Sequence, residues 1–255
     1  MNRSIRVCVL ILIIFSPFFL ELDHASANDG TTGSEWDFSV TPYVWGSGLV
    51  GTVGAKGHKA HINLSFSNVL DQLNRTGMIS FTGNRGKQFF MFDGMYLDIS
   101  NSGVTSNSDV IADIDVTTTR LQASWGTNFL KGDSFVLSGF AGIRYWDITN
   151  RLTLHTTSET LGTYKDSEAW LDPILGIRYE KNLTDKLSLL TMLDIGGFGV
   201  GSDFTWGGMI NIVWKYSERT YLNLGYRYLY VDYENNGFIM DAYNDGIFAG
   251  ITFRF

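Results

Sequence analysis

The most restrictive feature of this sequence is the alternation of its last eleven residues, 245–255 (DGIFAGITFRF). Counting back from Phe255 in steps of two gives a purely apolar series: Phe253, Ile251, Ala249 and Ile247. The other register mixes charged, polar, small and aromatic residues. A period of two is what a β-strand produces when one of its faces meets an apolar medium. Residues 245–255 are therefore predicted to form a strand with one apolar face.

The first 27 residues have the three parts of a secretory signal peptide. Arg3 and Arg6 supply the positive charge, residues 7–20 the apolar run, and Ala25 and Ala27 a small-residue cleavage site. The apolar run is shorter than the roughly 20 residues that a membrane-spanning helix needs. We expect residues 1–27 to be removed and residues 28–255 to form a single domain. The one cysteine, Cys8, lies in the leader, so the mature chain is predicted to have no disulfide and no cysteine-based zinc site.

The mature chain reads as about ten strands, each long enough to cross a membrane as part of a barrel. The predicted strands are 36–46, 76–83, 87–100, 113–130, 134–148, 169–181, 186–196, 204–215, 220–233 and 245–255. An open sheet would leave backbone groups unpaired in lipid, so strands that cross a membrane must close on themselves. The predicted fold is therefore an all-β, antiparallel, up-and-down transmembrane β-barrel of about ten strands, with eight to twelve as the range.

The lengths of the connections indicate how such a barrel is oriented. Short connections at 84–86, 131–133, 182–185 and 216–219 alternate with longer ones, rich in Ser, Thr, Asn and Asp, at 101–112, 149–168 and 234–244. This alternation is typical of short periplasmic turns and longer external loops.

One stretch, 49–75, interrupts the strand pattern and leaves three alternatives. The favoured interpretation is a large external loop with a surface hairpin and a short helix that Ser67 caps. A second is that this helix folds into the barrel mouth and plugs it. A third is that residues 58–64 cross the membrane, with another strand bringing the number to twelve.

The closing strand and the rhythm of strands and turns resemble those of Gram-negative outer-membrane β-barrel proteins, over essentially the whole mature chain. The opening WDFSVTPYVWG is also similar to that of a group of small, porin-like outer-membrane proteins to which no activity is attached. The resemblance implies location in the outer membrane, contact with its lipids, and assembly by periplasmic chaperones and the barrel assembly machinery. It also implies that the terminal pattern, Phe255, Phe253 and Ile251, is the assembly signal.

Charged residues fall into the register that faces the inside of the predicted barrel. A small repeat, Gly-x-Arg-Tyr, places a glycine two residues before an inward arginine, and we expect the glycine to leave room for the arginine side chain. The predicted lumen network consists of Arg120, Arg144, Arg178, Arg227, Asp172, Glu180 and Asp194, with Asp93 as a further partner. These residues either line a selective channel or form a structural ion-pair network, and the structural interpretation is favoured because buried charges must be paired.

The sequence offers little support for an enzyme, a metal site or a nucleic-acid partner. The acidic candidates Asp232, Glu234, Asp241 and Asp245, with His155, lack the local context of an outer-membrane protease. His58 and His61 alone are too few to bind zinc, so no metal and no cofactor is expected. The net charge of −7 argues against a nucleic-acid partner.

Three functions remain open at this stage. The first hypothesis is a narrow channel or porin-like protein for small solutes. The alternative is a non-conducting structural or surface-binding barrel of the adhesin kind, and an outer-membrane hydrolase comes last.

Overall fold

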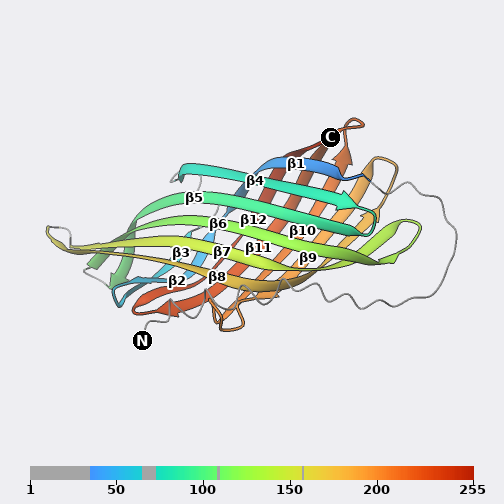
Figure 1. The fold of residues 1–255 in the computed structure, drawn as a ribbon. Helices are drawn as coiled ribbons and strands as arrows, with labels where there is room; N and C mark the ends of the chain where they lie inside the picture. Colours follow the sequence, from blue (N-terminus) through green and yellow to red (C-terminus); the bar gives the residue numbers. More distant parts are fainter. Residues whose placement is uncertain (1–34, 65–72, 108–109, 157) are drawn as a thin grey trace. The chain divides into compact units, whose positions relative to one another are not determined.

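The described residues fold into twelve β-strands, which Figure 1 shows. The computed structural model describes residues 35–64, 73–107, 110–156 and 158–255, all within one compact unit. The strands are β1 (Asp37–Ser47), β2 (Leu49–Ala55), β3 (His58–Leu64), β4 (Leu73–Arg85), β5 (Gln88–Asn107), β6 (Val110–Lys131), β7 (Phe135–His155), β8 (Thr160–Asn182), β9 (Leu187–Gly196), β10 (Phe204–Lys215), β11 (Thr220–Asn235) and β12 (Phe238–Arg254). Among these residues, no helix is long and apolar enough to cross a membrane.

Ten of these strands form a closed ring. Neighbours are antiparallel in the order β1-β4-β5-β6-β7-β8-β9-β10-β11-β12, and β12 pairs back with β1. At this seam, the backbone N–H of Phe255 donates to the carbonyl of Phe38 at 3.0 Å, and the N–H of Phe38 donates to the carbonyl of Phe255 at 3.2 Å. Closure supplies partners for the two edges that an open sheet would expose to lipid. The predicted antiparallel barrel of about ten strands is confirmed.

β2 and β3 form a hairpin that adds to the ring beside β12. β1 pairs with residues 246–254 of β12, and β2 pairs with residues 239–243. β2 therefore continues the line of β1 past Gly48, whose N–H donates to the carbonyl of Asp245 at 2.9 Å. β3 pairs with β2 and lies outside the ring. The expected surface hairpin is thus present in residues 49–64, whereas the expected helix around Ser67 falls outside the described residues.

The strands extend further from one end of the ring than the sequence predicts. Residues 101–112, 149–168 and 234–244 are predicted as loops, but β5 to β8, β11 and β12 run through most of them. These strands are the long ribbons toward the left of Figure 1. The prediction is wrong there because outward residues such as Thr149 and Thr153 are polar, which gives the composition of a loop. The inward residues Leu152 and Leu154 keep the alternation of a strand.

The four short connections are found where they are predicted, and all lie at the other end. We call this the turn end, and the part of the ring next to it the turn half. The extended half consists of β2, β3 and the parts of β5 to β8, β11 and β12 that lie beyond Arg120 and Arg144 along the barrel.

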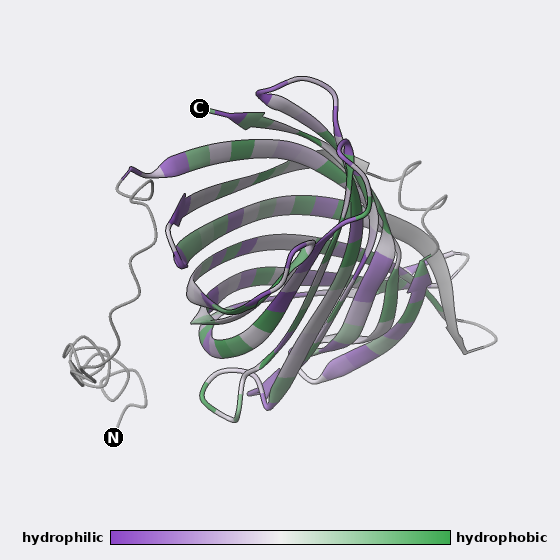
Figure 2. Ribbon diagram, turned by 90° about the vertical axis from the view of Figure 1, so that its right-hand side faces the viewer, coloured by the Kyte–Doolittle hydropathy of each residue, from purple (hydrophilic) through white to green (hydrophobic). Residues whose placement is uncertain are grey.

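An apolar belt surrounds the turn half. Figure 2, which views the barrel from the turn end, shows hydrophobic and hydrophilic residues alternating along the strands. Members of the belt are large, exposed and directed outward: Ile79, Phe92, Leu121, Trp125, Ile143, Leu175, Ile177, Leu193, Ile195, Ile210, Leu224, Ile247, Ile251 and Phe253. This surface is suited to lipid.

Two sheets face each other in the extended half and fill the space between them with apolar side chains. β5 to β8 form one sheet, and β11, β12, β2 and β3 form the other. β2 lies against β7 and β8, and Asn150 of β7 donates to the carbonyls of Gly54 and Ile239, both at 3.2 Å. The buried cluster between the sheets includes Leu49, Ile62, Met95, Ile114, Val116, Trp146, Ile148, Leu152, Trp170, Val231, Tyr233, Phe238 and Met240. The extended half is therefore a packed sandwich.

Candidate functional site

A cluster of charged side chains crosses the lumen where the two halves meet. Asp93 of β5 accepts hydrogen bonds from Arg120 of β6, from Arg227 of β11 at 3.2 Å and from the hydroxyl of Tyr43 at 2.9 Å. Arg227 also donates to the Tyr43 hydroxyl at 3.0 Å. One carboxylate thus joins β1, β5, β6 and β11 across the barrel. Such a bond network is strong in a low-dielectric interior because little water competes for its partners.

Arg144 of β7 forms the second part of this cluster. Its guanidinium donates to Asp194 at 2.6 Å, to Gln122 at 2.9 and 3.0 Å, and to the hydroxyl of Thr205 at 3.2 Å. The side chain is 1% exposed, so removing Asp194 would leave a buried charge without its partner. We call Arg120, Arg144, Arg227, Asp93 and Asp194 the arginine cluster.

The other predicted members of the network lie apart from the arginine cluster. Arg178 pairs with Glu180, its neighbour on β8, at 2.8 Å near the turn end. Asp172 is fully buried, and its carboxylate accepts from the indole of Trp146 at 2.9 Å and from Ser202 at 2.7 and 2.8 Å. The expected pairing of Asp172 with an arginine is therefore replaced by neutral donors, one of which comes from the β9–β10 connection.

The glycines of the Gly-x-Arg-Tyr repeat also serve a different purpose from the predicted one. A Cβ atom at Gly176 would lie 2.2 Å from the Phe140 ring, and one at Gly225 would lie 2.5 Å from the Phe248 ring. These two glycines leave space for inward aromatic rings of neighbouring strands, whereas a Cβ at the third, Gly142, would meet the backbone of Ala123 and Ser124; none of the three makes room for an arginine. The position that makes room for the charged cluster is Gly207, where a Cβ would lie 2.8 Å from the carboxylate of Asp194.

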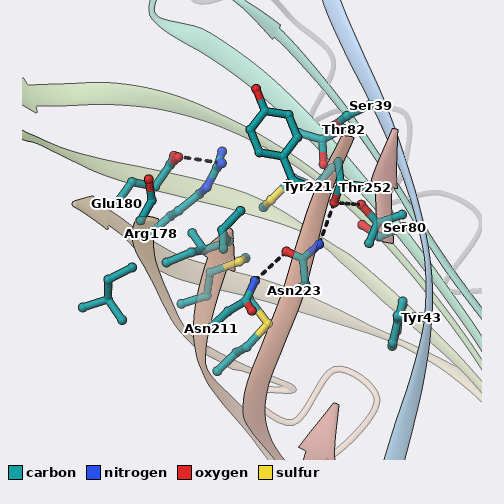
Figure 3. A pocket seen from close by; sticks show the side chains of 18 of the residues that line it. Ser39, Tyr43, Ser80, Thr82, Arg178, Glu180, Asn211, Tyr221, Asn223 and Thr252 are labelled. Carbon is teal, nitrogen blue, oxygen red and sulfur yellow. Dashed lines mark hydrogen bonds and ion pairs between the residues drawn. The ribbon is translucent and has the colours of Figure 1, made fainter. Parts of the chain in front are cut away.

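A cavity of about 930 Å³ lies between the arginine cluster and the turn end. Its inner end includes Asp93, Arg144 and Arg227, and its outer end reaches the connecting residues Asp133 and Lys186. Figure 3 shows part of its wall, with the Arg178–Glu180 pair on one side. On the other side, a chain of side-chain hydrogen bonds of 2.7 to 2.9 Å crosses four strands through Asn211, Asn223, Thr252 and Thr41.

The sequence places Tyr43 on the inner face of its strand but reveals neither its bonds to Asp93 and Arg227 nor this hydrogen-bonded chain. Each of these residues occupies the inward register of its strand, and that position is the signal that could have found them. The register alone does not reveal which inward residues meet, because the meeting depends on how far each strand is staggered against its neighbours.

The residues considered for hydrolysis do not form a common site among the described contacts. Asp232 of β11 and Asp241 of β12 are direct cross-strand partners on the outer surface, and Tyr230 donates to Asp241 at 2.8 Å. Partial burial and the nearby carboxylate of Asp241 raise the pKa of Asp232. His155 lies on the other sheet, where it pairs with Asp113 at 3.2 Å. Within the described part of the chain, no group of His, Cys, Asp and Glu side chains suits a metal ion.

Comparison with solved structures identifies the fold. The chain is similar to the outer-membrane protease OmpT from Escherichia coli, with a TM-score of 0.56 and 9% identity over 89% of this chain and 99% of that one. It also matches Neisserial surface protein A (TM-score 0.36, 12% identity, 88% and 100% covered) and the attachment invasion locus protein Ail of Yersinia pestis (0.34, 9%, 88% and 100%). No protein-family model and no curated protein matches the sequence.

The closed ring, its apolar belt and this likeness together define a Gram-negative type of outer-membrane β-barrel protein, located in the outer membrane. In barrels of this type, short turns usually face the periplasm and longer segments stand outside the membrane. At 9% identity, the likeness to a protease is one of fold alone.

Proposed function

We propose that this protein is a non-conducting barrel that acts through the outer surface of its extended half, as a structural or surface-binding protein. The observation that carries this proposal is the apolar cluster between the two external sheets. Trp146, Ile148 and Phe238 are each at most 2% exposed, and they lie in the path that a solute would follow along the lumen. An apolar constriction without space for water is a barrier to ions.

The outward face of β5 to β8 supports a role in binding at the cell surface. Side-chain hydrogen bonds connect neighbouring strands across it: Thr149 to Ser167 at 2.8 Å, Thr153 to Thr163 at 3.2 Å and Thr117 to Asp98 at 3.3 Å. This face is polar and is held by a packed core, so it offers a fixed array of hydroxyl and carboxylate groups. We propose that it contacts the sugar head groups of outer-leaflet lipids or a surface ligand.

Single-channel recording in a planar bilayer tests the proposal. The refolded mature chain, residues 28–255, is expected to give no discrete conductance steps, with heat-modifiable gel migration showing that it is folded. A variant in which a short Gly-Ser linker replaces residues 49–64 removes one wall of the packed core and is expected to conduct. The exposed substitution Lys56→Ala, in the same hairpin, is the matched control and should stay silent. Regular steps from the unaltered chain would overturn the proposal.

A narrow channel for small solutes is the second candidate, and the cavity of about 930 Å³ within the turn half favours it. In a channel, the arginine cluster would act as the selectivity filter. Conductance steps whose anion preference changes in Arg227→Gln would then replace the silence that we expect.

We further propose that Phe255, Phe253 and Ile251 are recognised by the barrel assembly machinery after periplasmic chaperones deliver the chain. All three side chains point outward and are at least 42% exposed at the turn end of β12. Their exposure makes them available to a partner before lipid covers them.

A further inference from the structure

We propose that the cavity of the turn half, whose mouth we place on the periplasmic side, binds a small amphipathic anion. Such a molecule has an apolar body and a carboxylate or phosphate head group. The cavity has the volume of a small-molecule site, for which about 300–1,000 Å³ is usual. It is closed toward the outside by the packed core, whose members Leu229 and Phe248 form part of its wall. A ligand would therefore enter from the periplasm and leave by the same route.

The apolar part of the site lies on β9 and β10. Cross-strand pairing places four inward residues in one row, in the order Arg178, Met192, Met209 and Arg227. Leu190 is the cross-strand partner of Asn211 in the row nearer the turn end. The two methionines thus form an adaptable apolar surface with an arginine at each end, and thioether side chains fit apolar groups of varied shape.

The unused hydrogen-bonding capacity of the cavity wall belongs to arginine. Three arginines of the cluster face two carboxylates, and both Asp93 and Asp194 already accept bonds from arginine. Nε of Arg178, which lines the cavity, is buried without a hydrogen-bond partner among the described residues. Buried donors of this kind are costly unless a partner completes them, and an anion is the partner that guanidinium groups bind most strongly.

Beside the methionines, Asn211 of β10 suits a polar edge of the same ligand. Asn211 is 3% exposed, and its side-chain oxygen has no donor among the described residues. Its amide group is held by Asn223, so the oxygen is fixed in place and can accept a bond from a hydroxyl group. The site thus combines an apolar surface, a cationic inner end and one free acceptor.

The methionines provide a direct test, because the mature chain has three in the cavity (Met91, Met192 and Met209) and three in the packed core (Met78, Met95 and Met240). The refolded mature chain, labelled with ¹³C at the methionine methyl groups, is placed in lipid nanodiscs and titrated with decanoate, decyl phosphate or decyltrimethylammonium. We expect both anions to shift the three cavity methyl signals in a saturable way and to leave the three core signals unchanged. The tighter of the two anions identifies the preferred head group.

The variant Arg178→Gln is expected to weaken binding of the anions at least tenfold, and unchanged core methyl signals would show that it is folded. Arg151→Gln, on the outer surface of β7, is the matched control and should bind as the parent does. Equal affinity for the cationic amphiphile, equal shifts in both sets of methionines, or no saturable shift would overturn the proposal. Each of these outcomes is independent of whether the barrel conducts ions.

Discussion

The same strands have apolar inward residues in the extended half of this barrel and charged or polar ones in the turn half. On β7, Ile148 and Leu152 are buried between the two sheets of the extended half, whereas Arg144 and Ser138 face inward nearer the turn end. The outward residues change in the opposite sense, from Thr149 to Ile143. Each half therefore has one apolar and one polar side, and the apolar side moves from the outer to the inner surface where the barrel leaves the lipid. The medium around each half, lipid or water, therefore decides which face of a strand must be apolar.

The largest expected effect is on the free energy of unfolding, when a methionine in each half is replaced by alanine. Met240→Ala removes a side chain that is 2% exposed in the packed core, and it should lower the free energy of unfolding by about 2–5 kcal/mol. Met209→Ala shortens a half-buried side chain that lines the cavity and touches the core only from its edge, so it should cost less, about 1 kcal/mol. Equilibrium unfolding in guanidinium from lipid vesicles measures both. Equal losses would mean that the turn half is packed as tightly as the extended half.

A smaller effect is expected at the contact that joins the two external sheets. Asn150→Ala removes the donor that serves the carbonyls of Gly54 and Ile239, and it should cost about 1–3 kcal/mol. Thr149→Ala, its neighbour on the exposed face, is the matched control and should change stability by less than about 0.5 kcal/mol. Hydrogen exchange should locate the loss in β2 and β12. A change spread evenly over the ring would contradict the separate packing of the extended half.

The smallest expected effect depends on pH and concerns the outer surface just beyond the lipid belt. Burial and then Asp241 raise the pKa of Asp232, so the folded state holds this proton more tightly than the unfolded state does. The stabilising contribution is present below the unfolded pKa of about 3.9 and is lost as pH rises through the folded pKa. Asp232→Asn should therefore stabilise the protein by a few tenths of a kcal/mol at pH 7 and have little effect near pH 3, after allowance for solvent screening.

Unfolding midpoints of Asp232→Asn at the two pH values measure this difference. The matched control is Asp115→Asn on the opposite sheet. A loss of stability in Asp232→Asn at neutral pH would contradict the repulsion that we assign to the carboxylates of Asp232 and Asp241.

The sequence predicts the turn half well because lipid imposes a strict pattern on it. Residues 245–255 and the four short connections have the expected structure, since an outward polar residue in lipid is costly and leaves a clear alternation. Much of the extended half escapes prediction because polar residues such as Thr149 and Ser167 on its outer face resemble a loop in composition. Leu152 and Leu154 alternate with Arg151 and Thr153 there, and that period of two is the signal that could have revealed the longer strands.

The candidate site is predictable in its residue types but not in its pairings. Arg144 and Asp194 lie together as their inward register allows, whereas Asp172 binds Trp146 and Ser202. The β9–β10 connection that supplies Ser202 has no periodicity to read. Pairing across a lumen depends on the stagger of strands far apart in the sequence, which no local pattern records.

The seam between β1 and β12 has a consequence for how the barrel forms. The ion pair of Asp37 with Arg254, which accompanies this seam, joins residues 217 positions apart, so the ring closes only when the two ends of the domain meet. Contacts of such long range make folding slow, because chain entropy is lost before the contact contributes any stability. A chain without β12 would leave the edges of β1 and β11 without a partner. Insertion should therefore be an all-or-none event for the whole domain, with partly inserted forms eliminated or kept outside the bilayer.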